Sequence, residues 1–124
     1  PNLRQVHLLS VELLADYAAA GIAVAPGELG ENLLTEGVDL HALPRGAVLR
    51  IGEAALEITG LRNPCAQIEA FCPGLLAHVL RREGGTLTRR AGVMAVVAHG
   101  GEVGIGEAIE TTLPAPPFQA LDRV

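Results

Sequence analysis

The chain has 124 residues, which is the size of one domain, and 49% of them are hydrophobic, so a core can form without disulfides or metals. Its net charge of −5, with one Tyr and two Phe, offers neither the basic surface nor the stacking platform of a nucleic-acid-binding protein. No Lys is present, which argues against pyridoxal phosphate, and no apolar run reaches ~18 residues, so no membrane partner is expected.

The first quarter of the chain predicts a strand, a helix and a long loop. Residues 4–9 form an apolar run typical of a strand. Ser10 is a good helix N-cap, the apolar residues that follow are at helical spacing, and Gly21 is a plausible stop, so a helix is expected over 11–20. Residues 21–46 are irregular, and long ordered loops in small domains are often functional.

Two alternating runs then predict a hairpin, and a later apolar run predicts a helix. The strands are expected over 47–51 and 55–59, with Gly52-Glu53 in the turn. The helix is expected over 75–83, ended by Gly84-Gly85.

The last third predicts two more strands and a tail. Residues 91–98 are nearly all apolar and predict a central strand, which a turn at 99–102 joins to a strand over 103–109. The proline-rich tail, 113–124, is expected to be extended and either to pack on a neighbour or to stay loose. Short strands joined by glycine turns, with two helices inserted, predict a mainly β (α+β) fold, a closed or nearly closed β-barrel.

Chemistry concentrates around one cysteine. Asn63 is a good N-cap and Pro64 suits the first helical position, which would place Cys65 in the first turn of a short helix. Free backbone N–H groups there, with Arg62 nearby, would stabilise a thiolate, the form that binds a soft metal or carries sulfur. A small buried hydrophobe is the alternative, and for Cys72, expected on the apolar face with Ile68 and Phe71, it is the favoured one.

The two cysteines also bear on compartment and metal binding. Their spacing of seven fits neither a disulfide framework nor a zinc site, so a reducing, cytoplasmic setting is expected. The four histidines have no metal-ligand spacing among them, and His41, in the long loop, is the best placed of them.

The residues around Cys65 resemble a known family. The run at 59–68, Thr-Gly-Leu-Arg-Asn-Pro-Cys-Ala-Gln-Ile, is similar to the signature of the MOSC domain, the molybdenum-cofactor sulfurase C-terminal domain. Residues 27–33 look like its Pro-Gly-x-x-Gly-Glu-Asn loop. Further similar steps keep the family order, at 37–40, 43–46, 92–97 and 104–109. The family often has Gly-Asp where this chain has Gly106-Glu107, and many members carry additional N-terminal strands.

This resemblance implies a MOSC, pyruvate-kinase-barrel-like β-barrel with the signature cysteine in a cleft. Cys65 would ligate molybdenum of the pterin cofactor or carry sulfur for its maturation, and the cofactor would be bound by Arg62, Asn63, Glu31 and Asn32. The arginine pairs at 81–82 and 89–90 could meet a pterin phosphate, although solvated faces are the favoured interpretation. Residues 1–124 are expected to be a single MOSC domain of the small stand-alone bacterial type, lacking its N-terminal strands.

Three functions stay open at this point. The first is a molybdenum-cofactor-binding or sulfur-carrying domain with Cys65 as metal ligand or persulfide carrier. The second is a molybdenum-dependent reductase of N-hydroxylated compounds, which needs a separate electron donor because the chain has no flavin or iron–sulfur motif. The third is a non-catalytic assembly module. The expected partners are a molybdopterin-type ligand, an electron-donor or sulfur-donor protein, and a second copy of the chain in a homo-oligomer.

Overall fold

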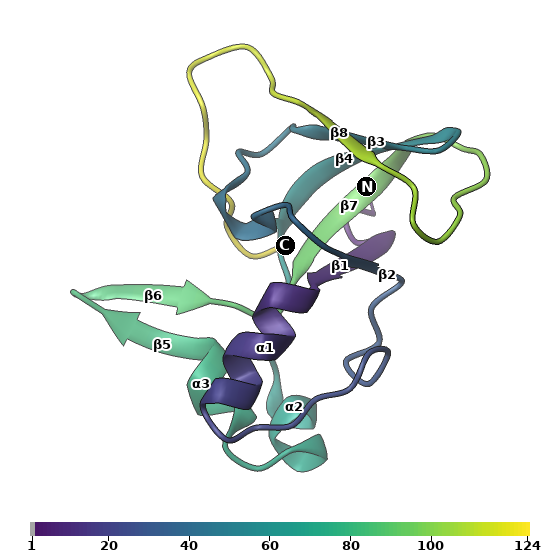
Figure 1. The fold of residues 1–124 in the computed structure, drawn as a ribbon. Helices are drawn as coiled ribbons and strands as arrows, with labels where there is room; N and C mark the ends of the chain where they lie inside the picture. Colours follow the sequence, from purple (N-terminus) through teal and green to yellow (C-terminus); the bar gives the residue numbers. More distant parts are fainter. Residues whose placement is uncertain (1) are drawn as a thin grey trace.

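The computed structural model describes residues 2–124 and contains a curved six-stranded sheet above a layer of helices (Figure 1). A two-stranded hairpin projects away from both (Figure 1). The elements in chain order are β1 (Val6–Ser10), α1 (Val11–Ala19), β2 (Leu33–Thr35), the 3-10 turn η1 (Leu40–Ala42), β3 (Val48–Ile51), β4 (Ala54–Leu61), α2 (Ala66–Phe71), α3 (Leu75–Val79), β5 (Leu80–Glu83), β6 (Thr86–Arg89), β7 (Val93–His99) and β8 (Ile109–Thr112).

The large sheet has the strand order β2-β1-β7-β4-β3-β8. Strand β7 pairs with β1 and β4, which confirms the central strand predicted from its apolar sequence. Only the β1–β2 pair is parallel. Within residues 2–124, β2 and β8 pair with no further strand, so the sheet is an open half-barrel. The mainly β prediction is confirmed, whereas the closed barrel is not observed.

The β3–β4 hairpin and the first helix form where local sequence signals place them. Ile51 pairs with Ala54, which leaves Gly52 at a φ of 56° in a two-residue turn. The Ser10 side chain accepts a hydrogen bond of 3.2 Å from the Leu13 backbone N–H and caps α1, as predicted.

The helix predicted over 75–83 is shorter than expected. It ends at Val79, and the next residues form β5, which pairs with β6 across Gly84-Gly85. Both glycines have positive φ, 58° and 83°, as a two-residue hairpin turn of the primed type requires. The glycine pair is therefore a hairpin turn and not a helix stop.

The strand predicted over 103–109 also lies elsewhere. Residues 100–108 form an irregular loop, and the strand begins only at Ile109. Glycine is abundant in that loop and weakens strand structure. The loop crosses the β3–β4 turn, where the Glu53 backbone N–H donates to the Glu102 carbonyl over 3.0 Å.

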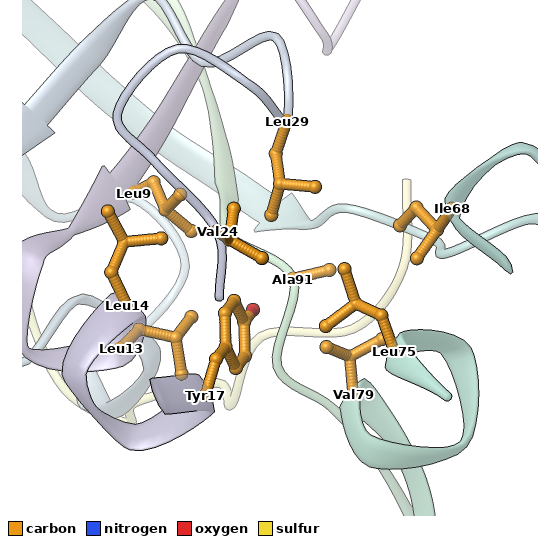
Figure 2. Packing of buried hydrophobic residues seen from close by; sticks show 10 residues of the cluster. All are labelled: Leu9, Leu13, Leu14, Tyr17, Val24, Leu29, Ile68, Leu75, Val79 and Ala91. Carbon is orange, nitrogen blue, oxygen red and sulfur yellow. The ribbon is translucent and has the colours of Figure 1, made fainter. Parts of the chain in front are cut away.

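The apolar interior has two clusters. One lies between the helical layer and the lower end of the sheet, around the fully buried Tyr17 (Figure 2). Its members are Leu9, Leu13, Leu14, Tyr17, Val24, Leu29, Ile68, Leu75, Val79 and Ala91. The other fills the concave side of the sheet and includes Leu8, Leu49, Ile58 and Val93. The helical layer that carries α2 is thereby fixed to the sheet.

The C-terminal tail, 113–124, is irregular with a bend at 115–117 and packs on its own chain. The Leu61 N–H donates to the Asp122 carbonyl over 2.7 Å, and the Val124 N–H donates to the Leu61 carbonyl over 3.1 Å. Gly60 permits this approach, because a Cβ there would lie 2.5 Å from the Asp122 carbonyl oxygen. Across residues 2–124, the helices are all too short and polar to traverse a lipid bilayer.

Candidate functional site

Cys65 lies at the junction between β4 and α2. The Arg62 N–H still donates to the Gly92 carbonyl over 3.0 Å, after which the chain leaves the sheet. Cys65 is exposed, has extended backbone angles (φ −132°, ψ 178°) and is itself the N-cap of α2. Its Sγ lies 4.0 Å from Gln67 Oε1. The sulfur is therefore accessible from solvent and not packed in the core.

The prediction that Asn63 caps this helix is wrong. The helix starts two residues later than expected, at Ala66. Cys65, which was predicted in the first turn, instead precedes it, and its side chain makes no capping hydrogen bond. The Asn63 side chain serves a different purpose, because its Oδ1 accepts a hydrogen bond of 3.2 Å from Arg89 Nε. Asn63 therefore contacts the β6 strand on one side of Cys65.

Arg62 extends to the other side of Cys65. Its guanidinium is partly buried and Nη1 donates to the Leu29 carbonyl over 2.8 Å. Burial lowers the pKa of Arg62, and the neighbouring Cys65 and Glu31 charges act in the opposite direction. The residues predicted from two separate motifs thus share one electrostatic environment, in which Arg62 connects the end of β4 to the loop at 27–32.

Glu31 and Asn32 shape that loop. Glu31 Oε2 accepts a hydrogen bond of 2.6 Å from the Gly27 N–H, whereas its Oε1 is buried and has no partner within residues 2–124. Asn32 forms two 2.8 Å hydrogen bonds with the backbone of His7, one through its side-chain Oδ1 and one through its own N–H. Asn32 therefore attaches the loop to β1, and the free carboxylate oxygen of Glu31 remains available as an acceptor.

His7 is a neighbour of the site that sequence reasoning missed. It is buried in β1, and its Nε2 lies 3.0 Å from the Ala91 carbonyl oxygen. Burial lowers the pKa of His7, and the charges of Arg62 and Glu31 act on it in opposite directions. All five residues of β1 are at least partly buried, so exposed and buried positions do not alternate along the strand. The sequence pattern therefore could not distinguish His7 from its apolar neighbours.

A cavity of about 260 Å³ lies between the loop and α2, next to Arg62. Its lining residues come from both elements and are Glu28, Leu29, Gly30, Arg62, Gln67, Ile68 and Phe71. Phe71 was predicted on the apolar face of α2 but is 45% exposed at this cavity, while Ile68 and Cys72 do pack against the core. Cys65, which the resemblance places in a cleft, is not among these lining residues, although its Sγ lies 4.0 Å from Oε1 of Gln67, which is one of them.

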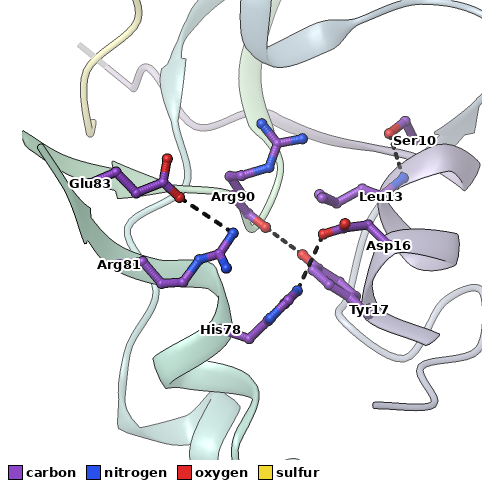
Figure 3. Close-up of polar contacts among 8 residues, drawn as sticks. All are labelled: Ser10, Leu13, Asp16, Tyr17, His78, Arg81, Glu83 and Arg90. Atoms are coloured by element: carbon purple, nitrogen blue, oxygen red, sulfur yellow. Dashed lines mark hydrogen bonds and ion pairs between the residues drawn. The ribbon is translucent and has the colours of Figure 1, made fainter. Parts of the chain in front are cut away.

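The donor set around Cys65 contains one soft ligand. Among residues 2–124, no group of three or more His, Cys, Asp or Glu side chains could hold a metal ion. His78 is engaged elsewhere, since its Nε2 lies 3.2 Å from Asp16 Oδ2 and its ring meets Tyr17 edge-on (Figure 3). Any metal bound at Cys65 must therefore bring most of its own ligands.

Comparisons with known proteins identify the family and the fold. The model of the MOSC domain family matches residues 1–110. The fold is similar to YiiM from Geobacillus stearothermophilus (TM-score 0.71, 15% identity over 94% of this chain) and YiiM from Escherichia coli (0.68, 22%, 94%). It is also similar to YuaD from Bacillus subtilis (0.71, 29%, 89%).

The chain spans 58% of the length of each YiiM structure and 64% of YuaD. No match was found among curated protein sequences. Since the family model covers most of the chain, and the motifs that carry the resemblance surround one exposed cysteine, this chain belongs to the MOSC domain family.

Proposed function

We propose that this domain binds the molybdenum cofactor, with Cys65 as a thiolate ligand of the metal or as the carrier of a sulfur atom for its maturation. The observation that supports the proposal is the exposed Cys65 next to a partly buried arginine, in a segment that resembles the family's signature. A non-catalytic assembly module would tolerate a buried thiol here, whereas Cys65 is exposed.

The residues present fit the cofactor. Molybdenum in its pterin complex already has sulfur ligands, so one protein thiolate is sufficient, and Cys65 supplies a donor of the soft type. The buried Glu31 Oε1 has no hydrogen-bond donor within residues 2–124. An unsatisfied buried carboxylate oxygen is costly, and the N–H groups of a pterin ring are donors of the kind it lacks.

The roles of the chain's own residues follow from their contacts. Arg62 holds the 27–32 loop through the Leu29 carbonyl and brings a positive charge close to Cys65. Asn32 fixes the loop to β1, and Asn63 holds Arg89 on the opposite side. When bound, the cofactor supplies a metal centre able to transfer an oxygen atom and two electrons.

The test is elemental analysis of protein produced in a host that makes the cofactor, together with the assay for cyanide-labile sulfur. Wild type should carry molybdenum or labile sulfur, and Cys65→Ser should lose it. Cys72→Ser is the matched control, because it removes the other thiol but leaves the site intact. If wild type and Cys65→Ser carry equally little of both, the proposal is wrong.

A further inference from the structure

A second polar site lies between η1, the β5–β6 hairpin and the C-terminal tail. It is a cavity of about 410 Å³ whose lining includes His41, Arg89 and Arg90. Arginines at 89–90 were expected on a solvated face, but the Arg89 side chain is only 14% exposed. A half-buried pair of guanidinium groups beside a cavity needs a partner to offset its desolvation.

Arg90 has no such partner. Its backbone is fully engaged, since its N–H donates to the Val79 carbonyl over 2.8 Å and its carbonyl accepts from the Tyr17 hydroxyl (Figure 3). Within residues 2–124 its guanidinium makes no hydrogen bond or ion pair, and Figure 3 shows it directed away from the contacts that its backbone makes. The backbone contacts fix the position of Arg90, so its free charge is held at the cavity.

His41 provides a second group without a partner at the same place. Its Nε2 is buried and has no hydrogen-bond partner within the described part of the chain. It lines the same cavity as Arg90, and also a neighbouring one that reaches Glu12 and Asp39. Two groups that can donate hydrogen bonds to an anion therefore converge on one cavity. One is buried and unpartnered, His41 Nε2, and the other is the half-buried guanidinium of Arg90.

The acidic residues of the cavity lie at its rim. Glu83 is 57% exposed and pairs with Arg81 at 3.4 Å. Asp122 is 86% exposed, and its contact with Arg89 is long, 3.9 Å. Arginine charges on the inside and solvated carboxylates at the rim give an interior that is positive, with the Thr86 hydroxyl available as a further donor.

From this arrangement we propose that the cavity binds a phosphate monoester dianion, held by Arg89, Arg90 and His41. The cavity volume exceeds that of the phosphate group and leaves room for an organic substituent. The phosphate could belong to a free metabolite or to the tail of a pterin cofactor, since the chemistry is shared. The cavity does not include Cys65, although Arg89 also donates to Asn63 of the proposed cofactor site. Phosphate binding can therefore be tested in a variant that lacks the Cys65 thiol.

The anion should be linked to the protonation of His41. Burial, and then the charge of Arg90, lower the pKa of His41 to about 4, while Asp39 acts to raise it and His7 acts to lower it further. Arg89, Glu83 and Asp122 also face the cavity. A dianion bound between Arg90 and His41 would offset the repulsion between the Arg90 charge and a protonated His41 ring. Anion binding should therefore raise the pKa of His41.

The experiment is a titration of the purified chain with inorganic phosphate, followed by calorimetry and by the NMR signals of the His41 ring. Wild type and Cys65→Ser should bind with equal affinity, and the His41 pKa should rise on saturation. Arg90→Gln should weaken binding roughly tenfold or more, as loss of a charged hydrogen bond does. Arg89→Gln should do the same, and it provides a second variant in case the first does not fold.

Arg50→Gln, on the exposed side of β3, is the charge-matched control and should bind as wild type does. The inference is overturned if wild type shows no saturable binding at millimolar phosphate, or if both cavity variants bind normally. Repeating the titration with cofactor-loaded protein identifies the source: exclusion of phosphate indicates the cofactor tail, and unchanged binding indicates a free phosphate ester. Loss of cofactor in Cys65→Ser with retained phosphate binding separates the two proposals.

Discussion

Replacing Arg62 by Met tests how the site is held together. The substitution keeps an unbranched apolar stem but removes the guanidinium that donates to the Leu29 carbonyl over 2.8 Å. A hydrogen bond from a charged donor contributes about 1.5–3 kcal/mol, and a partly buried carbonyl left unpaired incurs a desolvation cost. We expect the free energy of unfolding, measured by urea denaturation, to fall by about 1.5–3 kcal/mol.

The same variant should change the site locally. Amide hydrogen exchange over residues 27–32 should accelerate, because the loop loses its connection to β4. Alkylation of Cys65 by an anionic reagent such as iodoacetate should slow at fixed pH, because the cationic group that attracts the reagent is removed. Arg50→Met, at an exposed position on β3, should change neither property. If Arg62→Met matches that control in stability and in loop exchange, the argument for Arg62 as the connection is refuted.

Three further predictions concern stability. Gly92→Ala should lower the free energy of unfolding, measured by urea denaturation, by about 2–4 kcal/mol. The reason is that Gly92 has a φ of 108° and the new Cβ would lie 2.2 Å from His7 Nε2. Gly100→Ala is the control and should be nearly neutral, because no atom lies close to its Cβ position. Tyr17→Phe should lower the free energy of unfolding by about 1–3 kcal/mol, because it leaves the Arg90 carbonyl without its hydroxyl donor. An unchanged urea midpoint would contradict this prediction. His41 has its pKa lowered from 6.5 to about 4, so the unfolded chain binds its proton first as the pH falls. The free energy of unfolding should therefore fall by up to about 3 kcal/mol as the pH is lowered from 6.5 to 4. His41→Gln should not show this part of the fall, because it has no imidazole to protonate.

Local signals in the sequence predicted much of the fold. Ser10 and the Gly52-Glu53 turn were identified correctly because each depends on residues close to it in the chain. Gly84-Gly85 was misassigned because paired glycines serve equally as a helix stop and as a hairpin turn, and only pairing of the flanking strands decides between them. The open sheet likewise depends on whether distant edges meet, for which no local pattern exists.

The site was predictable as a set of residues but not as an arrangement. The motifs named Cys65 and Arg62, yet the contact between Arg62 and Leu29 joins residues 33 apart in the chain. The expected N-cap at Asn63 failed because its side chain is taken by Arg89, a residue of another strand. His41 and Arg90 are far apart in the chain, and only the fold brings them to one cavity.

The most direct test of the central claim is native mass spectrometry of freshly purified protein from a host that makes the cofactor. The account predicts a species heavier than the bare chain by the molybdenum cofactor or by one sulfur atom, present in wild type and in Cys72→Ser but absent in Cys65→Ser. A wild-type spectrum that contains only the unmodified chain, or the same added mass retained in Cys65→Ser, would contradict it.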